Sequence, residues 1–180
     1  MITIISATNR PKSECLKFSE LTFNILKSKT KEDIKLLDMS SISYDWIHSD
    51  MYNKTKVSDS LHQIINEYLT PSSKWIVVSP EYNGSYPGIF KLFLDACSVT
   101  PLKNNIYPKK SALIGVASGR AGNLRGMDHL TGVLNYLGFI LYPDKLPISS
   151  IKSLQDENGH ITHENTLITL VNFLDKVLEF

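Results

Sequence analysis

The sequence contains little that would cross-link the chain or anchor it to a membrane. Only 2 of its 180 residues are cysteine, Cys15 and Cys97, and neither belongs to a CxxC motif. A secreted disulfide framework, a zinc ribbon and an iron–sulfur cluster are therefore disfavoured, and a reducing, cytoplasmic setting is expected. No apolar run reaches the ~18 residues of a membrane-spanning helix. Residues 1–10 also lack the basic leader and cleavage site of a signal peptide.

The sequence also has no large excess of positive or negative charge. The 19 Lys and Arg residues nearly balance the 18 Asp and Glu residues, which gives a formal net charge of +1. Because there is also no run of Lys or Arg, a nucleic-acid-binding protein is disfavoured. The hydrophobic content of 42% is ordinary for a globular protein. We expect residues 1–180 to form one domain with a sizeable core.

Short apolar runs alternate with segments of helical period along the chain. Five strand-then-helix units predict a parallel sheet covered by helices on both faces, with strand order 2-1-3-4-5. Gly138 is a predicted C-terminal cap of the fourth helix. The predicted strands are residues 2–6, 34–37, 75–79, 112–117 and 139–141, and the predicted helices are residues 13–29, 61–69, 87–98, 123–137 and 167–178.

An open parallel sheet binds ligands at the carboxyl ends of its strands, so the three loops after strands one, three and four are expected to share a pocket. The first loop, residues 7–13, offers the hydroxyls of Thr8 and Ser13, the guanidinium of Arg10 and the amides of a helix start. These groups predict a phosphate cradle, although GxxxxGK[ST] and GxGxxG are absent. The alternative is that Ser13 only caps the helix and Arg10 is solvated.

The second loop, residues 80–88, reads PEYNGSYPG. Its Pro, Asn-Gly and Pro-Gly elements define a tight backbone, and Tyr82 and Tyr86 flank small residues. This combination predicts a site for a planar heteroaromatic ring. The alternative is a simple tight turn with packed tyrosines.

The third loop, residues 118–126, contains three glycines and the cations Arg120 and Arg125. The glycines predict close approach of the backbone to a ring or pyrophosphate, and the arginines are candidates for an anionic part of a second ligand. The alternative is a flexible connector. The five histidines of the chain show neither metal-binding nor triad spacing.

Residues 80–88, followed by Lys91 and Asp95, resemble the signature of the NADPH-dependent FMN reductase family, flavodoxin-like enzymes that include azo, quinone and chromate reductases. The resemblance extends over essentially the whole chain. It implies a flavodoxin-like three-layer sandwich that binds FMN and uses NADPH or NADH as co-substrate. It further implies hydride transfer through the flavin to a small acceptor such as a quinone, an azo compound or free flavin, without a catalytic side chain or a metal.

The resemblance also implies which residues bind FMN. Two positions depart from the family pattern, because Ala7 stands at a usual Gly and Cys15 at a usual Asn, and weaker flavin binding is the expected consequence. Cys97 is expected to pack within a helix. The implied FMN-binding residues are Thr8, Arg10, Ser13, Cys15, Pro80, Glu81, Tyr82, Asn83, Gly84, Ser85, Ser118, Gly119 and Arg120.

Two other functions stay open. A flavodoxin-type electron carrier shares the expected fold, but such carriers are usually strongly acidic and this chain is neutral. The other is a family member that has lost flavin binding through Ala7 and Cys15. The acceptor and the choice between NADPH and NADH are not indicated by the sequence.

A homodimer or tetramer is expected, because the third predicted helix is apolar nearly all round. In such an assembly the irregular segment 45–56, which includes Trp46, is a candidate to cover the flavin of a second subunit and shape the acceptor pocket. Packing over the sheet edge is the equally weighted alternative.

Overall fold

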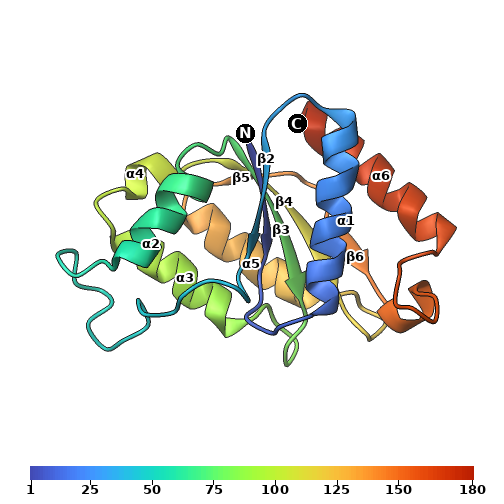
Figure 1. The fold of residues 1–180 in the computed structure, drawn as a ribbon, viewed down its shortest axis with the longest axis horizontal. Coiled ribbons are helices and arrows are strands. Elements are labelled where there is room, and N and C mark those ends of the chain that lie inside the picture. Colours follow the sequence, from blue (N-terminus) through green and yellow to red (C-terminus); the bar gives the residue numbers. More distant parts are fainter.

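A twisted parallel sheet runs through the middle of the protein, with helices on both of its faces (Figure 1). A computed structural model describes all residues from 1 to 180. The strands follow the order β2-β1-β3-β4-β5, and every pairing is parallel, which confirms the predicted flavodoxin-like fold and strand order. The strands are β1 (Ile2–Ser6), β2 (Ile34–Asp38), β3 (Lys74–Pro80), β4 (Lys110–Val116), β5 (Ile140–Leu141) and β6 (Leu146–Ile148).

The position beside β4 is shared by two short strands. β5 pairs with Lys110 and Ser111 at the start of β4, whereas β6 pairs with Ile114, Gly115 and Val116 at its end. β6 was not predicted, because its three residues are too few for a recognisable pattern and include a proline. A proline is tolerated here because the strand lies at the sheet edge. β6 brings the following turn to the carboxyl end of the sheet.

Two helices cover one face of the sheet and four cover the other (Figure 1). α1 and α6 lie on the first face, and α2 to α5 lie on the second. None of the helices combines the length and the apolar character needed to cross a bilayer. The helices are α1 (Glu14–Lys29), α2 (Asp59–Ile64) with the π-helical turn η1 (Ile65–Leu69), α3 (Gly88–Val99), α4 (Lys103–Ile106), α5 (Leu124–Tyr136), the 3-10 turn η2 (Ile151–Leu154) and α6 (Glu164–Glu179).

The central strands divide the apolar core into two halves. Ile5 and Val77 contribute to the half beneath α2 to α5, and Ile4 and Ile76 contribute to the half beneath α1 and α6. Successive strand residues point to opposite faces, so a continuous apolar run supplies both halves. All seven residues of β3 are buried. This rigid sheet fixes the positions from which the three loops start.

The segment between β2 and α2 packs onto α3. Trp46 is only 2% exposed, its ring centroid lies 5.8 Å from that of Phe93, and its indole N–H donates to the Ser43 carbonyl at 2.8 Å. The interpretation of Trp46 as an acceptor-pocket residue is therefore wrong, because the indole belongs to the core. Cys97 is fully buried in α3, as predicted, and burial raises the pKa of its thiol.

The same packing explains the apolar character of α3 without a second subunit. Ile89 and Leu92, on the outer side of the helix, are half-buried against the core of this chain. Leu102, immediately before α4, is half-buried against the same core. Most of the apolar side chains of α3 therefore pack against residues of the same chain.

Candidate functional site

The carboxyl ends of β1, β3 and β4 lie side by side at the lower edge of Figure 1, and a cavity opens between the loops that follow them. Its volume of about 370 Å³ lies within the ~300–1,000 Å³ typical of ligand pockets. All three predicted loops contribute to its lining. The predicted site residues that line it are Arg10, Ser13, Cys15, Pro80, Glu81, Tyr82 and Ser118.

The first loop ends in a capped helix start. The Ser13 hydroxyl accepts a hydrogen bond from the Leu16 amide at 3.1 Å, which makes Ser13 the N-cap of α1. The amides of Ser13, Glu14 and Cys15 donate no hydrogen bond within the chain. Free amides and the helix dipole at a helix start favour a bound anion, so this end of the cavity suits a phosphate.

The second loop forms a two-residue β-hairpin, Tyr82–Ser85. Tyr82 and Ser85 exchange backbone hydrogen bonds of 2.9 and 3.1 Å, and Asn83 (φ 52°) and Gly84 (φ 76°) both adopt left-handed backbone. Asn-Gly is the sequence that best tolerates this mirror-image turn. The predicted tight turn is confirmed. The amides of Asn83 and Gly84 have no partner within the chain and are available to a ligand.

The hairpin is joined to the first loop by Tyr82. Its hydroxyl lies 2.8 Å from the Thr8 hydroxyl, which also accepts from the Arg10 amide at 3.2 Å. Thr8 is fully buried behind this contact. Tyr86 instead packs against the core beside α3, and burial raises the pKa of its hydroxyl. Only one of the two loop tyrosines therefore lines the cavity.

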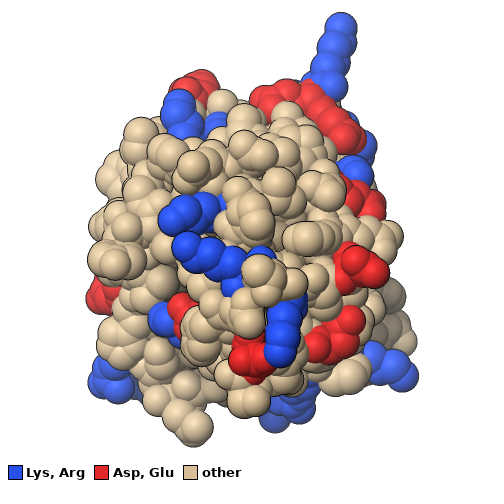
Figure 2. All heavy atoms as spheres, turned by 90° about the vertical axis from the view of Figure 1, so that its left-hand side faces the viewer, with Lys and Arg blue, Asp and Glu red and all other residues tan.

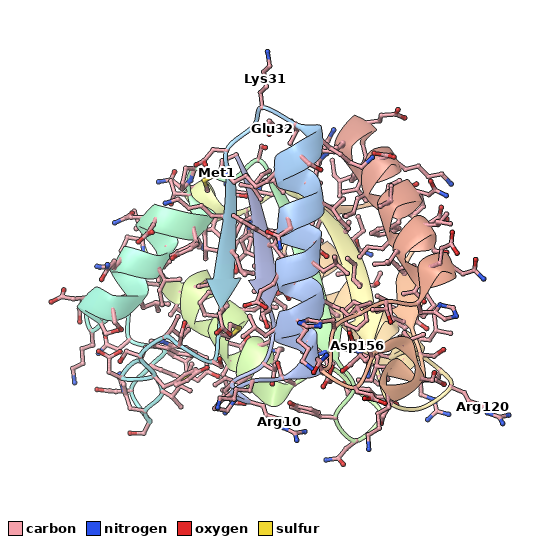
Figure 3. All side chains as sticks on the ribbon, turned by 45° about the vertical axis from the view of Figure 1, so that its right-hand side comes forward. Met1, Arg10, Lys31, Glu32, Arg120 and Asp156 are labelled. Atoms are coloured by element: carbon pink, nitrogen blue, oxygen red, sulfur yellow. The ribbon has the colours of Figure 1, made fainter.

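The glycines of the third loop differ from the prediction. A Cβ on Gly122 would lie 2.7 Å from Pro147, and one on Gly126 would lie 2.0 Å from the Asn123 side chain, so these glycines make room for the protein itself. Only Gly119 has open space around it. Arg120 extends outward from the lower edge of the molecule, as does Arg10 (Figure 3).

A comparison with known protein families shows to which family this chain belongs. The sequence model of the NADPH-dependent FMN reductases matches residues 1–152. The chain belongs to the NADPH-dependent FMN reductase family. It is therefore an oxidoreductase, and the family name implies a flavin and a nicotinamide cofactor.

Individual relatives agree with this family. A 2-hydroxy-1,4-benzoquinone reductase from Burkholderia sp is 31% identical over 144 residues, which cover 76% of this chain and 78% of the relative. The structure of FerB, a flavoenzyme NAD(P)H:(acceptor) oxidoreductase from Paracoccus denitrificans, has a TM-score of 0.78 at 20% identity and covers 99% of this chain and 94% of its own. An azoreductase from Bacillus anthracis str. Sterne has a TM-score of 0.67 at 15% identity, with 98% and 97% covered. At these identities the two structures show the shared fold.

Cys15 is one of the two positions, with Ala7, at which the sequence was expected to depart from the family pattern. Its thiol donates to the Val78 carbonyl at 3.0 Å, and the Ser6 hydroxyl lies 3.6 Å from the sulfur. Burial raises the pKa of the thiol to about 12, so it stays neutral. The side chain is committed to the sheet, and residue 15 can offer an anion only its backbone amide.

The cavity also contains residues outside the predicted FMN-binding set. Lys12 lines it from the first loop, and Ile151 and Lys152 line it from η2. Neither lysine nor Arg10 forms an ion pair, whereas Glu14 pairs with Lys17 at 3.1 Å, so cations outnumber free carboxylates. Ile151 and Lys152 follow β6, whose three residues with a proline gave no recognisable strand pattern in the sequence.

Several predicted residues do not line the cavity but follow directly in sequence on Tyr82 or Ser118, which do. Asn83, Gly84 and Ser85 form the tip of the hairpin, and Gly119 and Arg120 continue the third loop beyond Ser118. The chain contains no group of three His, Cys, Asp or Glu side chains that could hold a metal ion.

Proposed function

We propose that this chain is an NAD(P)H-dependent oxidoreductase that binds FMN in the cavity at the carboxyl ends of β1, β3 and β4 and reduces a small quinone. One observation carries the proposal. A helix start with free amides lines the cavity, and the hairpin that begins at the lining residue Tyr82 carries free amides at Asn83 and Gly84, so the chain offers a phosphate site and a nearby ring-edge site. This donor set fits a flavin mononucleotide, which has a phosphate at one end and a polar-edged ring at the other.

The phosphate end is assigned to the first loop. The guanidinium of Arg10, the hydroxyl of Ser13 and the amide of Cys15 would hold the phosphate, because charged and backbone donors together bind phosphate oxygens strongly. Lys12 and Lys152 add positive charge to the same cavity. The hydroxyl of Thr8 orients Tyr82 and so connects this end to the hairpin.

The ring end is assigned to the other two loops. The amides of Asn83 and Gly84 would hydrogen-bond the polar edge of the ring, with Pro80 and Glu81 beside it. Ser118, Gly119 and Arg120 would border it from the third loop. When bound, FMN supplies the redox chemistry, accepting two electrons from NAD(P)H and passing them to the acceptor. The side chains bind and orient, and none is needed as a nucleophile.

A quinone is the acceptor that we favour. The 31% identical relative is named for the reduction of a benzoquinone, and that identity extends over most of both chains. In the net reaction NAD(P)H and one proton reduce the quinone to a hydroquinone and leave NAD(P)⁺. The exposed cations Arg120 and Arg125 lie at the same end of the molecule as the hairpin and would meet the anionic part of the nicotinamide nucleotide.

The test begins with flavin binding. Purified protein is titrated with FMN and then, without oxygen, with NADPH and NADH, followed by a panel of quinones, azo dyes and free flavin. We expect quenching of FMN fluorescence, bleaching of the flavin absorbance by either nucleotide and reoxidation fastest by a quinone. Protein that binds no FMN would contradict the proposal and favour a member that has lost its flavin. Bound flavin that neither nucleotide reduces would favour an electron carrier.

We also propose that the chain forms a homodimer or a tetramer. Tyr136 of α5 is 90% exposed and lies beside a groove of about 860 Å³ between α3, α4 and α5. The neighbouring side of the molecule is uncharged over much of its upper part and carries a group of Lys or Arg side chains near its middle (Figure 2). A large exposed aromatic side chain at a groove suits a contact with a second copy. Sedimentation of a monomer at micromolar concentration would contradict this.

A further inference from the structure

One face of α5 contacts the segment that carries the hairpin. Asn123, Gly126 and His129 are spaced three residues apart, which places them along one side of the helix. Each of the three touches a residue between Ser79 and Ser85. We call these three residues the α5 stripe.

Asn123 holds the root of the hairpin. Its side-chain amide donates to the Ser79 carbonyl at 2.9 Å and to the Pro80 carbonyl at 3.0 Å, and lies 3.3 Å from the Ser79 hydroxyl. Ser79 and Pro80 are the last residues of β3, immediately before the loop. Asn123 therefore fixes the direction in which the chain leaves the sheet.

Gly126 and His129 hold the other end of the hairpin. A Cβ on Gly126 would lie 2.8 Å from the carbonyl carbon of Ser85, so the backbone of Ser85 rests directly on the helix. The Ser85 hydroxyl lies 2.9 Å from His129 Nδ1. The hairpin is thus attached to α5 at both its root and its far end.

Asn123 occupies an unfavourable conformation for this role. It is fully buried, it has the left-handed φ of 65°, and its side-chain oxygen has no hydrogen-bond partner. Buried groups without a partner and left-handed non-glycine residues both reduce stability and tend to gather at functional sites. In this unfavourable conformation the Asn123 side chain forms its hydrogen bonds with the Ser79 and Pro80 carbonyls of β3.

We propose that the α5 stripe positions the hairpin against the flavin ring, with Asn123 as the principal positioning residue. The inference rests on the proposed function, because it concerns the ring end of the same site. None of the stripe residues lines the cavity, so they act through the hairpin. The first loop, in contrast, is held by the Ser13 cap and by the hydrogen bond of 2.9 Å from the Thr8 amide to the Ser6 carbonyl of β1, and forms no hydrogen bond with the stripe.

This division of roles is tested by comparing FMN with riboflavin, which lacks the phosphate. Asn123→Gly retains a residue that tolerates the left-handed backbone and removes the hydrogen bonds. We expect it to raise the Kd of FMN and of riboflavin by the same factor, about tenfold. The visible circular dichroism of the bound flavin should change as well. Asn135→Ala, at an exposed position of the same helix, is the matched control and should leave both Kd values unchanged.

His129 gives a second test that does not touch the core. His129→Ala should raise both Kd values about threefold, because one hydrogen bond to the hairpin is lost. His129→Asn, which keeps a polar atom close to the position of Nδ1, should restore them. If Asn123→Gly fails to fold, this pair decides the question alone.

The possible outcomes distinguish a failure of this inference from a failure of the proposed function. Wild-type protein that binds neither flavin would overturn the proposed function and the inference with it. Wild-type binding with unchanged Kd values in the stripe variants would overturn the inference only. A loss confined to FMN would also overturn it, since the effect would then lie at the phosphate end. A lower melting temperature with unchanged Kd and circular dichroism would mean that the stripe is merely structural.

Discussion

The two ends of the cavity are built in different ways. The phosphate end uses contacts between residues close in sequence, such as the Ser13 cap of α1 and the bond from the Arg10 amide to Thr8. The ring end depends on contacts across the fold, because α5 holds a hairpin that lies about 40 residues earlier in the chain. Local contacts can be recognised in a sequence, whereas contacts of the second kind exist only after the sheet and α5 have assembled.

The largest expected effect is at the ring end, from Gly126→Ala. The added Cβ would collide with the Asn123 side chain at 2.0 Å and with the Ser85 backbone at 2.8 Å, and backbone cannot move cheaply. We expect the free energy of unfolding to fall by about 3 kcal/mol. Gly132→Ala on the same helix meets no atom within 4 Å and should raise that free energy by about 0.5–1 kcal/mol. Denaturant titration measures both, and equal effects would contradict the predicted contact.

At the phosphate end, Arg10→Ala should weaken FMN binding without affecting riboflavin. Loss of a charged hydrogen bond costs about 2 kcal/mol, or about 30-fold in Kd. Lys31→Ala, at the opposite end of the molecule, is the control for a lost positive charge (Figure 3). Fluorescence titration with each flavin measures the ratio of the two affinities. An equal loss for both flavins would mean that Arg10 does not contact the phosphate.

Ser13→Ala separates capping from ligand binding. Losing an N-cap costs about 1 kcal/mol of stability, and the same cost is expected for Ser58→Ala at the start of α2. Only Ser13→Ala should also raise the Kd of FMN, by about fivefold. Thermal unfolding and flavin titration of the two variants make the comparison. If both variants leave the affinity unchanged, Ser13 is a cap alone.

The smallest expected effect comes from removing the contact between Tyr82 and Thr8, which joins the ring end of the cavity to the phosphate end. Tyr82→Phe removes the hydroxyl that contacts Thr8, and one neutral hydrogen bond corresponds to about threefold in the Kd of FMN. Tyr86→Phe removes a hydroxyl outside the cavity and should change nothing. Calorimetric titration resolves a difference of this size. An effect of Tyr86→Phe as large as that of Tyr82→Phe would show that the link is not specific.

Much of the fold followed from local pattern. β1 has the predicted bounds, α1 begins after the predicted cap at Ser13, and the turn at Asn83–Gly84 has the predicted conformation. β6 escaped prediction because three residues with a proline carry no periodic signal. Lys152 was not predicted as a site residue either, because its position at the cavity depends on β6, the strand that precedes η2.

Tertiary packing gave some residues a role different from the predicted one. Trp46 was expected at an acceptor pocket and is buried against Phe93. Gly122 and Gly126 were expected to admit a ligand and instead admit neighbouring parts of the chain. A sequence shows that a position needs a small side chain, but the atoms that need the space come from other elements.

By itself, the sequence determined the alternation of buried strands and amphipathic helices, the helix cap at Ser13, the tight Asn83–Gly84 turn and the family resemblance. These depend on periodicity and on the conformations that single residues allow. Only the tertiary structure decided that β6 completes the sheet, that the Cys15 thiol is bound to the sheet, and that Asn123 holds the hairpin. Each of these depends on a partner that only folding brings within hydrogen-bond distance.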